Sequence, residues 1–348
     1  MKIAELETPA LLIDLDRLER NLERWQRFCA ERGVRNRPHV KTHKIPEVAR
    51  MQVESGAVGV TCQKLGEAEA MADGGIGDLF LPYNVVGEAK LERLSGLHRR
   101  VERLRVAADS REVGEGLERM AAKAGKPLEV MVECDTGMHR VGIGSPEAAV
   151  ELAAWIASRA VLKFAGFCTY PANDEATAFM KKAVRLAGER GLSDFGISGG
   201  GTPGMWKFSE VWTEYRAGTY AYYDRITVAA GVASPEDCAL TVLASVVSTA
   251  GEAWVTVDAG TKALSSDQYG QTGFGTLLEE PGGLLVRASE EHGVLQVRGG
   301  KPALALGAKV RVVPNHACIV SNLYDVAYAV RGDEVVAQWR ITARGKLQ

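Results

Sequence analysis

Residues 37–44 read Arg-Pro-His-Val-Lys-Thr-His-Lys, and they place Lys41 at the end of a short strand-like run. The polar residues that follow are typical of the point where a strand gives way to an active-site loop. Lysine is the side chain that forms a Schiff base with a carbonyl cofactor or substrate. A surface lysine in a basic loop is the alternative, because lysine is common on protein surfaces. The segment predicts a strand end, and the rest of the chain decides the role of Lys41.

Apolar runs alternate with helical patterns from residue 10 to about residue 230. The first run covers residues 10–13, and the helical segment after it ends near Gly33. Later strand-like runs, separated by helical stretches, cover residues 58–61, 78–82, 104–108, 128–134, 162–169 and 195–198. About eight β-α units of parallel strands fit a closed barrel better than an open doubly wound sheet. The sequence therefore predicts an α/β fold with a TIM-type (β/α)8 barrel.

The pattern changes after residues 233–237, which read Ala-Ser-Pro-Glu-Asp. Helical periodicity disappears there, and short β-branched runs follow, separated by Gly and Pro. These runs cover residues 240–249, 253–258, 294–297, 309–313 and 334–342. The sequence predicts a barrel over residues 8–233 and a mainly antiparallel β domain over residues 234–348, on which residues 1–7 pack.

The composition points to a small-molecule partner. The chain has 348 residues, a formal net charge of -2 and a pI of about 6.4. Acidic and basic residues are interspersed, so the sequence shows neither a nucleic-acid footprint nor a polybasic membrane anchor. No apolar stretch reaches the ~18 residues of a membrane span, and residues 1–7 lack the apolar run of a signal peptide. The six cysteines are scattered without a CxxC pair, so we expect reduced thiols and a cytoplasmic protein.

The run Ser198-Gly-Gly-Gly-Thr202 follows a strand-like segment. Its three glycines let backbone N–H groups converge on an anion, and Ser198 and Thr202 add hydroxyl donors. This arrangement suits a phosphate group. It is neither a P-loop, which needs Lys-Ser/Thr after the last glycine, nor a GxGxxG fingerprint. The alternative is a tight turn without a ligand.

Two arginines occur in similar surroundings. Arg140 lies in residues 134–142, after another strand, where it could hold an anionic oxygen as a permanently charged donor. The alternative is an arginine that bridges helices outside the barrel. Arg216, in residues 214–220, would keep a pyridine ring unprotonated if it lay beside the ring nitrogen, which makes the ring a weaker electron sink. The alternative is a structural arginine at the domain junction.

His316 and Cys318 form an H-x-C pair in the run Pro314-Asn-His-Ala-Cys318. On a strand, residues i and i+2 point to the same face, and imidazole and thiolate are both good zinc ligands. Two ligands cannot close a structural site, but they could form an open site that water or substrate completes. The alternative is a half-buried pair without a metal. Tyr170, at the end of the 162–169 run, could stack on a cofactor ring or belong to the core.

These motifs occur in an order that resembles the D-threonine aldolase / D-serine dehydratase group of pyridoxal-phosphate (PLP) enzymes, relatives of alanine racemase. The resemblance covers essentially the whole chain, through residues 8–14, 37–44, 135–142, 198–202, 216–220 and 314–318. It implies an alanine-racemase-like fold, in which a TIM-type barrel is followed by a β domain, and a protein that is usually a homodimer.

The resemblance also implies roles for single residues. PLP would form its Schiff base with Lys41, Arg140 would lie near the PLP phenolic oxygen, Tyr170 would stack on the ring, and Arg216 would face the pyridine nitrogen. The phosphate cup would contain Ser198, Gly200, Gly201, Gly218 and Thr219.

His316 and Cys318 match the divalent-metal pair of this group, which alanine racemases lack, and this argues against simple racemisation. The metal would act as a Lewis acid on the β-hydroxyl of a D-amino acid. Zinc or manganese are the expected ions, with magnesium as a further choice, and the thiolate of Cys318 favours zinc over magnesium. That the substrate belongs to the D series is implied by the resemblance alone.

The expected activity is that of a PLP- and metal-dependent lyase acting on D-β-hydroxy-α-amino acids. The first choice is a D-serine/D-threonine dehydratase, in which Lys41 removes the α-proton and a keto acid and ammonia are released. The H-x-C pair resembles that branch, whereas the aldolases look more like H-x-D and tend to carry a histidine where residues 171–174 have none. The alternative is a D-threonine aldolase, which gives glycine and an aldehyde. An amino-acid racemase or a non-catalytic PLP-binding protein are further alternatives, and residues 235–348 argue against the latter.

Overall fold

The computed structural model describes residues 1–280, 282–297 and 302–348, which form two compact units. The barrel unit consists of residues 26–41, 46–218 and 346–348. The β unit consists of residues 1–25, 42–45 and 219–345. Residues 1–25 and 219–233 are therefore grouped with the β unit, which differs from the division predicted at residues 233/234. Helix α1 (Leu15–Glu31) runs from one unit into the other.

In the described residues, the barrel unit has an eight-stranded parallel sheet in the order β2-β9-β8-β7-β6-β5-β4-β3. Its strands are β2 (Arg35–Asn36), β3 (Val60–Thr61), β4 (Asp78–Leu81), β5 (Arg103–Ala108), β6 (Leu128–Glu133), β7 (Leu162–Cys168), β8 (Gly196–Gly199) and β9 (Glu214–Tyr215). A parallel bridge between His39 and Thr61 joins the two ends of this order, and the Thr61 N–H donates to the Pro38 carbonyl at 2.8 Å. The closed parallel order confirms the predicted α/β barrel.

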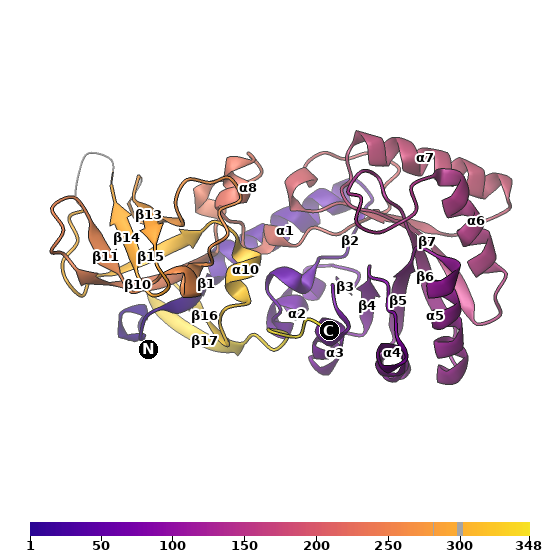
Figure 1. Cartoon of the computed structure of the whole chain (residues 1–348), viewed down its shortest axis with the longest axis horizontal. Helices are drawn as coiled ribbons and strands as arrows, with labels where there is room; N and C mark the ends of the chain where they lie inside the picture. Colours follow the sequence, from indigo (N-terminus) through magenta and orange to yellow (C-terminus); the bar gives the residue numbers. More distant parts are fainter. Residues whose placement is uncertain (281, 298–301) are drawn as a thin grey trace. The chain divides into compact units, whose positions relative to one another are not determined.

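Helices follow the strands of the barrel unit, and Figure 1 shows α4 to α7 outside β5 to β7. The helices are α2 (Pro46–Glu54), α3 (Leu65–Asp73), α4 (Glu88–Arg100), α5 (Arg111–Ala124), α6 (Pro146–Ala157) and α7 (Asp174–Glu189). Local signals set their ends, as α5 illustrates. The Ser110 side chain accepts a hydrogen bond from the Val113 N–H at its start, and Gly125 ends it in the left-handed region with φ 68°.

The β unit, over its described residues, contains a nine-stranded sheet in the order β11-β14-β13-β12-β15-β10-β1-β16-β17, and β11 also pairs with β10. The strands are β1 (Ala10–Asp14), β10 (Leu240–Ser248), β11 (Val255–Val257), β12 (Gly275–Leu277), β13 (Leu284–Ala288), β14 (Gly293–Gln296), β15 (Lys309–Pro314), β16 (Val326–Arg331) and β17 (Glu334–Arg340). All pairings except β1–β16 are antiparallel, which confirms a mainly antiparallel β domain. Short helices α8 (Arg225–Ala229), α9 (Thr261–Leu264) and α10 (Ala317–Ser321) accompany the sheet.

Strand β1 lies in a different sheet from the one that the sequence pattern indicates. It pairs with β10 and β16, and its Leu12 packs in a cluster with Ile3, Leu6, Leu243 and Val330. A run that is apolar on both faces shows that a strand is buried, but it does not show which sheet buries it. Within the described ranges, no helix combines the length and the apolar character that a membrane span needs.

Candidate active site

Lys41 lies in a short 3-10 turn, η2 (Val40–Thr42), which follows β2 at the carboxyl end of the barrel. The backbone N–H of Lys41 donates to Nδ1 of His39 at 3.4 Å, and Nε2 of His39 lies 3.1 Å from Oε1 of Gln63. Lys41 is an exposed residue.

Arg140 and Tyr170 lie together at the ends of neighbouring strands β6 and β7. The Arg140 guanidinium carbon is 5.6 Å from the centroid of the Tyr170 ring. Asp135 shapes the loop that carries Arg140, because its Oδ1 accepts hydrogen bonds from the N–H groups of Gly137 and His139, both at 3.0 Å. The structure thus places the predicted anion-binding arginine beside the predicted stacking tyrosine.

The glycine run after β8 is shaped by two aromatic rings. A Cβ on Gly200, where φ is 80°, would approach the Tyr215 ring to 2.1 Å, and a Cβ on Gly201 would approach Cε2 of Tyr170 to 2.7 Å. Both positions therefore require glycine. Thr202 is buried at the start of the turn η3 (Thr202–Gly204).

Arg216 has one donor without a protein acceptor. Its Nη2 donates to the Thr169 carbonyl at 2.7 Å, while its buried Nη1 has no hydrogen-bond partner in the described residues. The guanidinium carbon lies 5.3 Å from the centroid of the Phe80 ring. Buried donors are normally satisfied, so the free Nη1 fits an acceptor atom of a ligand, such as a ring nitrogen. Nearby, burial raises the pKa of Glu133 despite the charges of Arg216 and Arg140.

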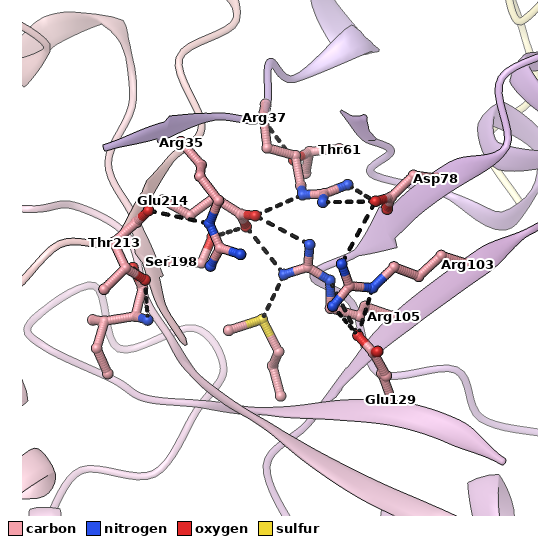
Figure 2. A network of polar contacts seen from close by, with 12 residues as sticks. Arg35, Arg37, Thr61, Asp78, Arg103, Arg105, Glu129, Ser198, Thr213 and Glu214 are labelled. Atoms are coloured by element: carbon pink, nitrogen blue, oxygen red, sulfur yellow. Dashed lines mark hydrogen bonds and ion pairs between the residues drawn. The ribbon is translucent and has the colours of Figure 1, made fainter. Parts of the chain in front are cut away.

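A network of buried ions lies inside the barrel unit, and Figure 2 shows it around Glu214. Oε2 of Glu214 accepts hydrogen bonds from Nε of Arg37 at 2.8 Å and from Nη2 of Arg105 at 3.1 Å. Oε1 accepts from the Ser198 hydroxyl at 2.8 Å, and Arg37 also forms an ion pair with Asp78 at 2.7 Å. Burial acts to raise the pKa of Glu214, but Arg37 and Arg105 outweigh it and hold the pKa well below its usual range. We call this set of residues the Glu214 network.

The Glu214 network was not anticipated from the sequence. Glu214 precedes the predicted cofactor arginine by two residues, and Arg37 precedes Lys41 by four. A charged residue inside an otherwise apolar strand could have indicated the network, as in the run Arg-Leu-Arg-Val-Ala-Ala of β5. The network also engages the Ser198 hydroxyl, which therefore faces Glu214.

His316 and Cys318 lie at the start of a helix, so the prediction that they share a strand face is wrong. Strand β15 ends at Pro314, His316 caps α10 with extended backbone angles, and Cys318 is the second residue of that helix. The Asn315 side chain donates to the Gly273 carbonyl at 2.9 Å, and the Ala317 N–H donates to Oδ2 of Asp224 at 3.0 Å. These bonds hold the turn from strand to helix, which sequence alternation does not reveal.

The Cys318 sulfur is surrounded by polar groups of the β unit. Its Sγ lies 3.1 Å from Oγ1 of Thr42 and 3.4 Å from Oγ1 of Thr219. Thr42 follows Lys41 in the chain, and Thr219 follows Gly218. The two threonines that contact Cys318 therefore each directly follow a predicted cofactor residue in the chain.

His316 lies between Cys318 and Asp267, and its Nδ1 is 3.2 Å from Oδ2 of Asp267. Burial acts to lower the pKa of His316, but contacts with Cys318 and Asp267 raise it to about 9. Burial likewise acts to raise the pKa of Cys318, but His316, Thr219 and Thr42 outweigh it and lower the pKa. His316 and Cys318 therefore lie close enough to interact, and a thiol and an imidazole bind a divalent cation once each has lost its proton. We call the set of His316, Cys318, Thr42, Thr219 and Asp267 the Cys318 cluster.

The donor set of the Cys318 cluster fits an open metal centre. No group of three or more His, Cys, Asp or Glu side chains suited to a metal ion occurs in the part of the chain that the structure describes. His316 and Cys318 would supply two ligands and leave the remaining positions to water or substrate, one protein ligand fewer than the three that catalytic zinc sites usually have. The sequence did not indicate Asp267, because its contact with His316 spans 49 residues.

Comparison with known proteins identifies the family. The sequence profile described as "Alanine racemase, N-terminal domain" matches residues 13–225, and the profile "Putative serine dehydratase domain" matches residues 239–330. A 3-hydroxy-D-aspartate aldolase from Paracoccus denitrificans is 34% identical, over 99% of this chain and 94% of the relative.

Solved structures agree with this assignment. The crystal structure of D-threonine aldolase from Filomicrobium marinum has a TM-score of 0.89 and 34% identity, over 100% of this chain and 98% of that chain. D-threo-3-hydroxyaspartate dehydratase from Delftia sp. HT23 has a TM-score of 0.87 and 31% identity, over 97% and 98% of the two chains. One further structure of D-threo-3-hydroxyaspartate dehydratase carries a His-to-Ala replacement. Another, in the metal-free form, carries a Cys-to-Ala replacement two positions later.

These matches span both the barrel and the β domain, and they agree with the order of motifs read from the sequence. The resemblance that the motifs indicated is therefore confirmed. The chain belongs to the D-threonine aldolase / D-serine dehydratase family of alanine-racemase-like enzymes and is a PLP-dependent lyase.

Proposed function

We propose that the protein is a D-serine/D-threonine dehydratase that depends on PLP and a divalent metal and releases a keto acid and ammonia. The observation that carries this proposal is the Cys318 cluster. A histidine and a cysteine, with Thr42 and Thr219 around the sulfur, provide a soft, incomplete ligand set suited to zinc. A cation held there would polarise the β-oxygen of a bound amino acid.

The residues of the barrel unit fit the cofactor. Lys41 would hold PLP covalently, the unpartnered Nη1 of Arg216 would donate to the ring nitrogen, and Arg140 with Tyr170 would contact the ring and its oxygen. When bound, PLP supplies an electron sink for the negative charge that develops at Cα. Backbone N–H groups at Gly200, Gly201 and Gly218, together with Thr202, would hold the phosphate.

Different residues of the chain would act at the two substrate bonds that break, the Cα–H bond and the Cβ–O bond. The Lys41 amine, once released from the cofactor, would accept the proton from Cα. His316 and Cys318 would hold the cation, which would supply Lewis acidity for the departure of the β-oxygen. D-Threonine would lose one water molecule, and one water molecule would be taken up later. The products are then 2-oxobutanoate and ammonia.

The choice of a dehydratase rests on the identity of the second ligand. The solved dehydratase variants carry a replaced histidine and a replaced cysteine two positions apart, and the cysteine variant is metal-free. The spacing of His316 and Cys318 is the same. This match favours dehydration over cleavage of the Cα–Cβ bond.

A D-threonine aldolase is the second candidate. It is favoured by relatives with aldolase activity, which are 34% identical to this chain over nearly their whole length. A base would then take the β-hydroxyl proton, and the Cα–Cβ bond would break to give glycine and acetaldehyde.

Product analysis with D-threonine separates the two reactions. The holoenzyme with added zinc should release 2-oxobutanoate and ammonia in equal amounts, measured by chromatography and an ammonia assay. L-Threonine is the matched control and should give neither product. Glycine and acetaldehyde from D-threonine would refute the dehydratase proposal in favour of the aldolase.

A further inference from the structure

Tyr222 carries a buried hydroxyl without a hydrogen-bond partner in the described residues. The residue is fully buried, with 0% of its surface exposed. Its backbone N–H donates to the Thr219 carbonyl at 2.9 Å, and its own carbonyl accepts from the Ala239 N–H at 2.7 Å. The position of the ring is therefore fixed, while its polar end is left unsatisfied.

The contacts on either side of Tyr222 lead to the Cys318 cluster. Three residues earlier, Oγ1 of Thr219 lies 3.4 Å from Sγ of Cys318. Two residues later, Oδ2 of Asp224 accepts a hydrogen bond from the Ala317 N–H at 3.0 Å, between the two predicted metal ligands. The Tyr222 ring also meets the ring of His43 edge to face, with centroids 6.3 Å apart.

The neighbouring tyrosine provides an internal comparison. Tyr223 is also fully buried, but its hydroxyl is hydrogen-bonded to Arg24. Leaving a buried hydroxyl unpaired costs stability, so such groups are rare in folded proteins. The chain satisfies the polar end of Tyr223 and leaves that of Tyr222 open beside the metal pair.

The Tyr222 hydroxyl remains a donor at neutral pH. The ordinary pKa of a tyrosine hydroxyl is about 10, so the group carries its proton at neutral pH. The ring contacts and backbone bonds leave the O–H without an acceptor in the described residues. An oxygen ligand of the metal is such an acceptor.

We propose that the Tyr222 hydroxyl is a further binding group of the metal centre and donates a hydrogen bond to the oxygen that completes the coordination. That oxygen belongs to water in the resting enzyme and to the β-hydroxyl of the substrate in the complex. Only the part of the inference that concerns the substrate β-hydroxyl rests on the proposed function. The hydroxyl keeps its proton, so its role is to bind and orient the β-oxygen, and it selects amino acids that carry one.

The first test uses Tyr222→Phe in cobalt-substituted holoenzyme, because Co²⁺ reports its ligands by visible absorption. The variant removes one oxygen and keeps the ring. A donor to metal-bound hydroxide lowers the pKa of the bound water, so its loss should raise that pKa by about one unit in a pH titration of the cobalt spectrum. Tyr223→Phe is the matched control and should titrate like the wild type. Identical titrations of all three proteins, or failure of the wild type to bind cobalt, would overturn the inference.

The second test compares substrates with and without a β-hydroxyl. In Tyr222→Phe, kcat/KM for D-serine should fall about tenfold or more, as expected for loss of a hydrogen bond to a charged oxygen. The binding of D-alanine, followed through the cofactor absorbance, should stay within twofold of the wild type. An equal loss for both ligands would overturn the inference, because a general packing defect has that effect. If the wild type releases no keto acid but the cobalt titration still shifts, the proposed function fails and the binding role of Tyr222 stands.

Discussion

The Glu214 network is buried and the Cys318 cluster is half-buried, and they differ in how their central groups are paired. Both oxygens of Glu214 accept hydrogen bonds, from Arg37, Arg105 and Ser198. Around Cys318, His316 and two threonine hydroxyls lie close to the sulfur, and the buried hydroxyl of Tyr222 has no partner in the described residues. A paired buried carboxylate stabilises the fold, whereas an unpartnered buried hydroxyl beside candidate metal ligands suits a ligand oxygen.

The two assemblies also differ in what they hold in place. The Glu214 network connects the strands that lead to Lys41, to the glycine run and to Arg216. The Cys318 cluster contains Thr42 and Thr219, which directly follow Lys41 and Gly218. We infer that one assembly positions the cofactor residues and that the other supplies chemistry at the β-carbon of the substrate.

Lys41→Ala should have the largest effect, because it removes the amine that both anchors PLP and takes the α-proton. We expect a loss of lyase activity of about 10⁴-fold or more and loss of the absorbance of the lysine-bound cofactor. Spectra and keto-acid release of the purified variant check this. Lys44→Ala is the control, since Nζ of Lys44 lies 3.5 Å from the Ala343 carbonyl. A yellow chromophore retained in Lys41→Ala would mean that another lysine binds PLP.

His316→Ala should rank second and separate the metal from the cofactor. Loss of several kcal/mol of charge stabilisation lowers turnover about 10³-fold. The cofactor absorbance should remain, because the Glu214 network is untouched. His292→Ala, at an exposed position, should leave both properties unchanged. Full turnover of His316→Ala in a strong chelator would contradict a catalytic metal.

Glu214→Gln should act mainly on stability, with a loss of about 3 kcal/mol in the free energy of unfolding, because two buried arginines each lose one of their two counter-charges. The pKa of Glu214 is lowered in the folded protein, so its contribution is complete above the unfolded value of about 4.3 and is lost as the pH falls further. Urea unfolding at pH 7 and pH 3 should show a difference between wild type and variant that shrinks in acid. An equal difference at both pH values would mean that the Glu214 charge does not stabilise the fold. Glu92→Gln, in an exposed pair with Lys123, should show no measurable change.

Asp267→Ala should have the smallest effect of the four and act on metal affinity. A carboxylate that orients a histidine ligand typically contributes 10- to 100-fold in affinity, so about a tenfold loss is expected. Competition with a chromophoric chelator measures it. Asp267→Asn, which keeps an acceptor, should recover part of the loss, and Asp325→Ala, in an exposed ion pair with Arg344, should have no effect. Unaltered zinc affinity in Asp267→Ala would remove Asp267 from the centre.

The sequence predicted the two architectures because periodicity is a local property. Alternating strand and helix patterns indicated the barrel, and short β-branched runs indicated the β domain. It could not assign β1 to its sheet, since an apolar strand has no preference between two cores. It placed His316 and Cys318 on a strand because no local signal shows that β15 stops at Pro314.

The candidate site was predicted through its motifs, and the residues that support it were not. Lys41, Arg216 and the H-x-C pair stand in recognisable runs of sequence. Glu214, Asp267 and Tyr222 act through contacts between distant segments, and each looks unremarkable beside its neighbours in the chain. Such residues become visible only when burial and hydrogen-bond partners are known.

The most direct test of the account is an assay of the four threonine stereoisomers with metal-free enzyme, before and after addition of zinc. We expect 2-oxobutanoate from the D series only, and only after zinc is added. Glycine in place of 2-oxobutanoate, or equal turnover in the absence of the metal, would contradict the claim that His316 and Cys318 hold the cation that expels the β-oxygen.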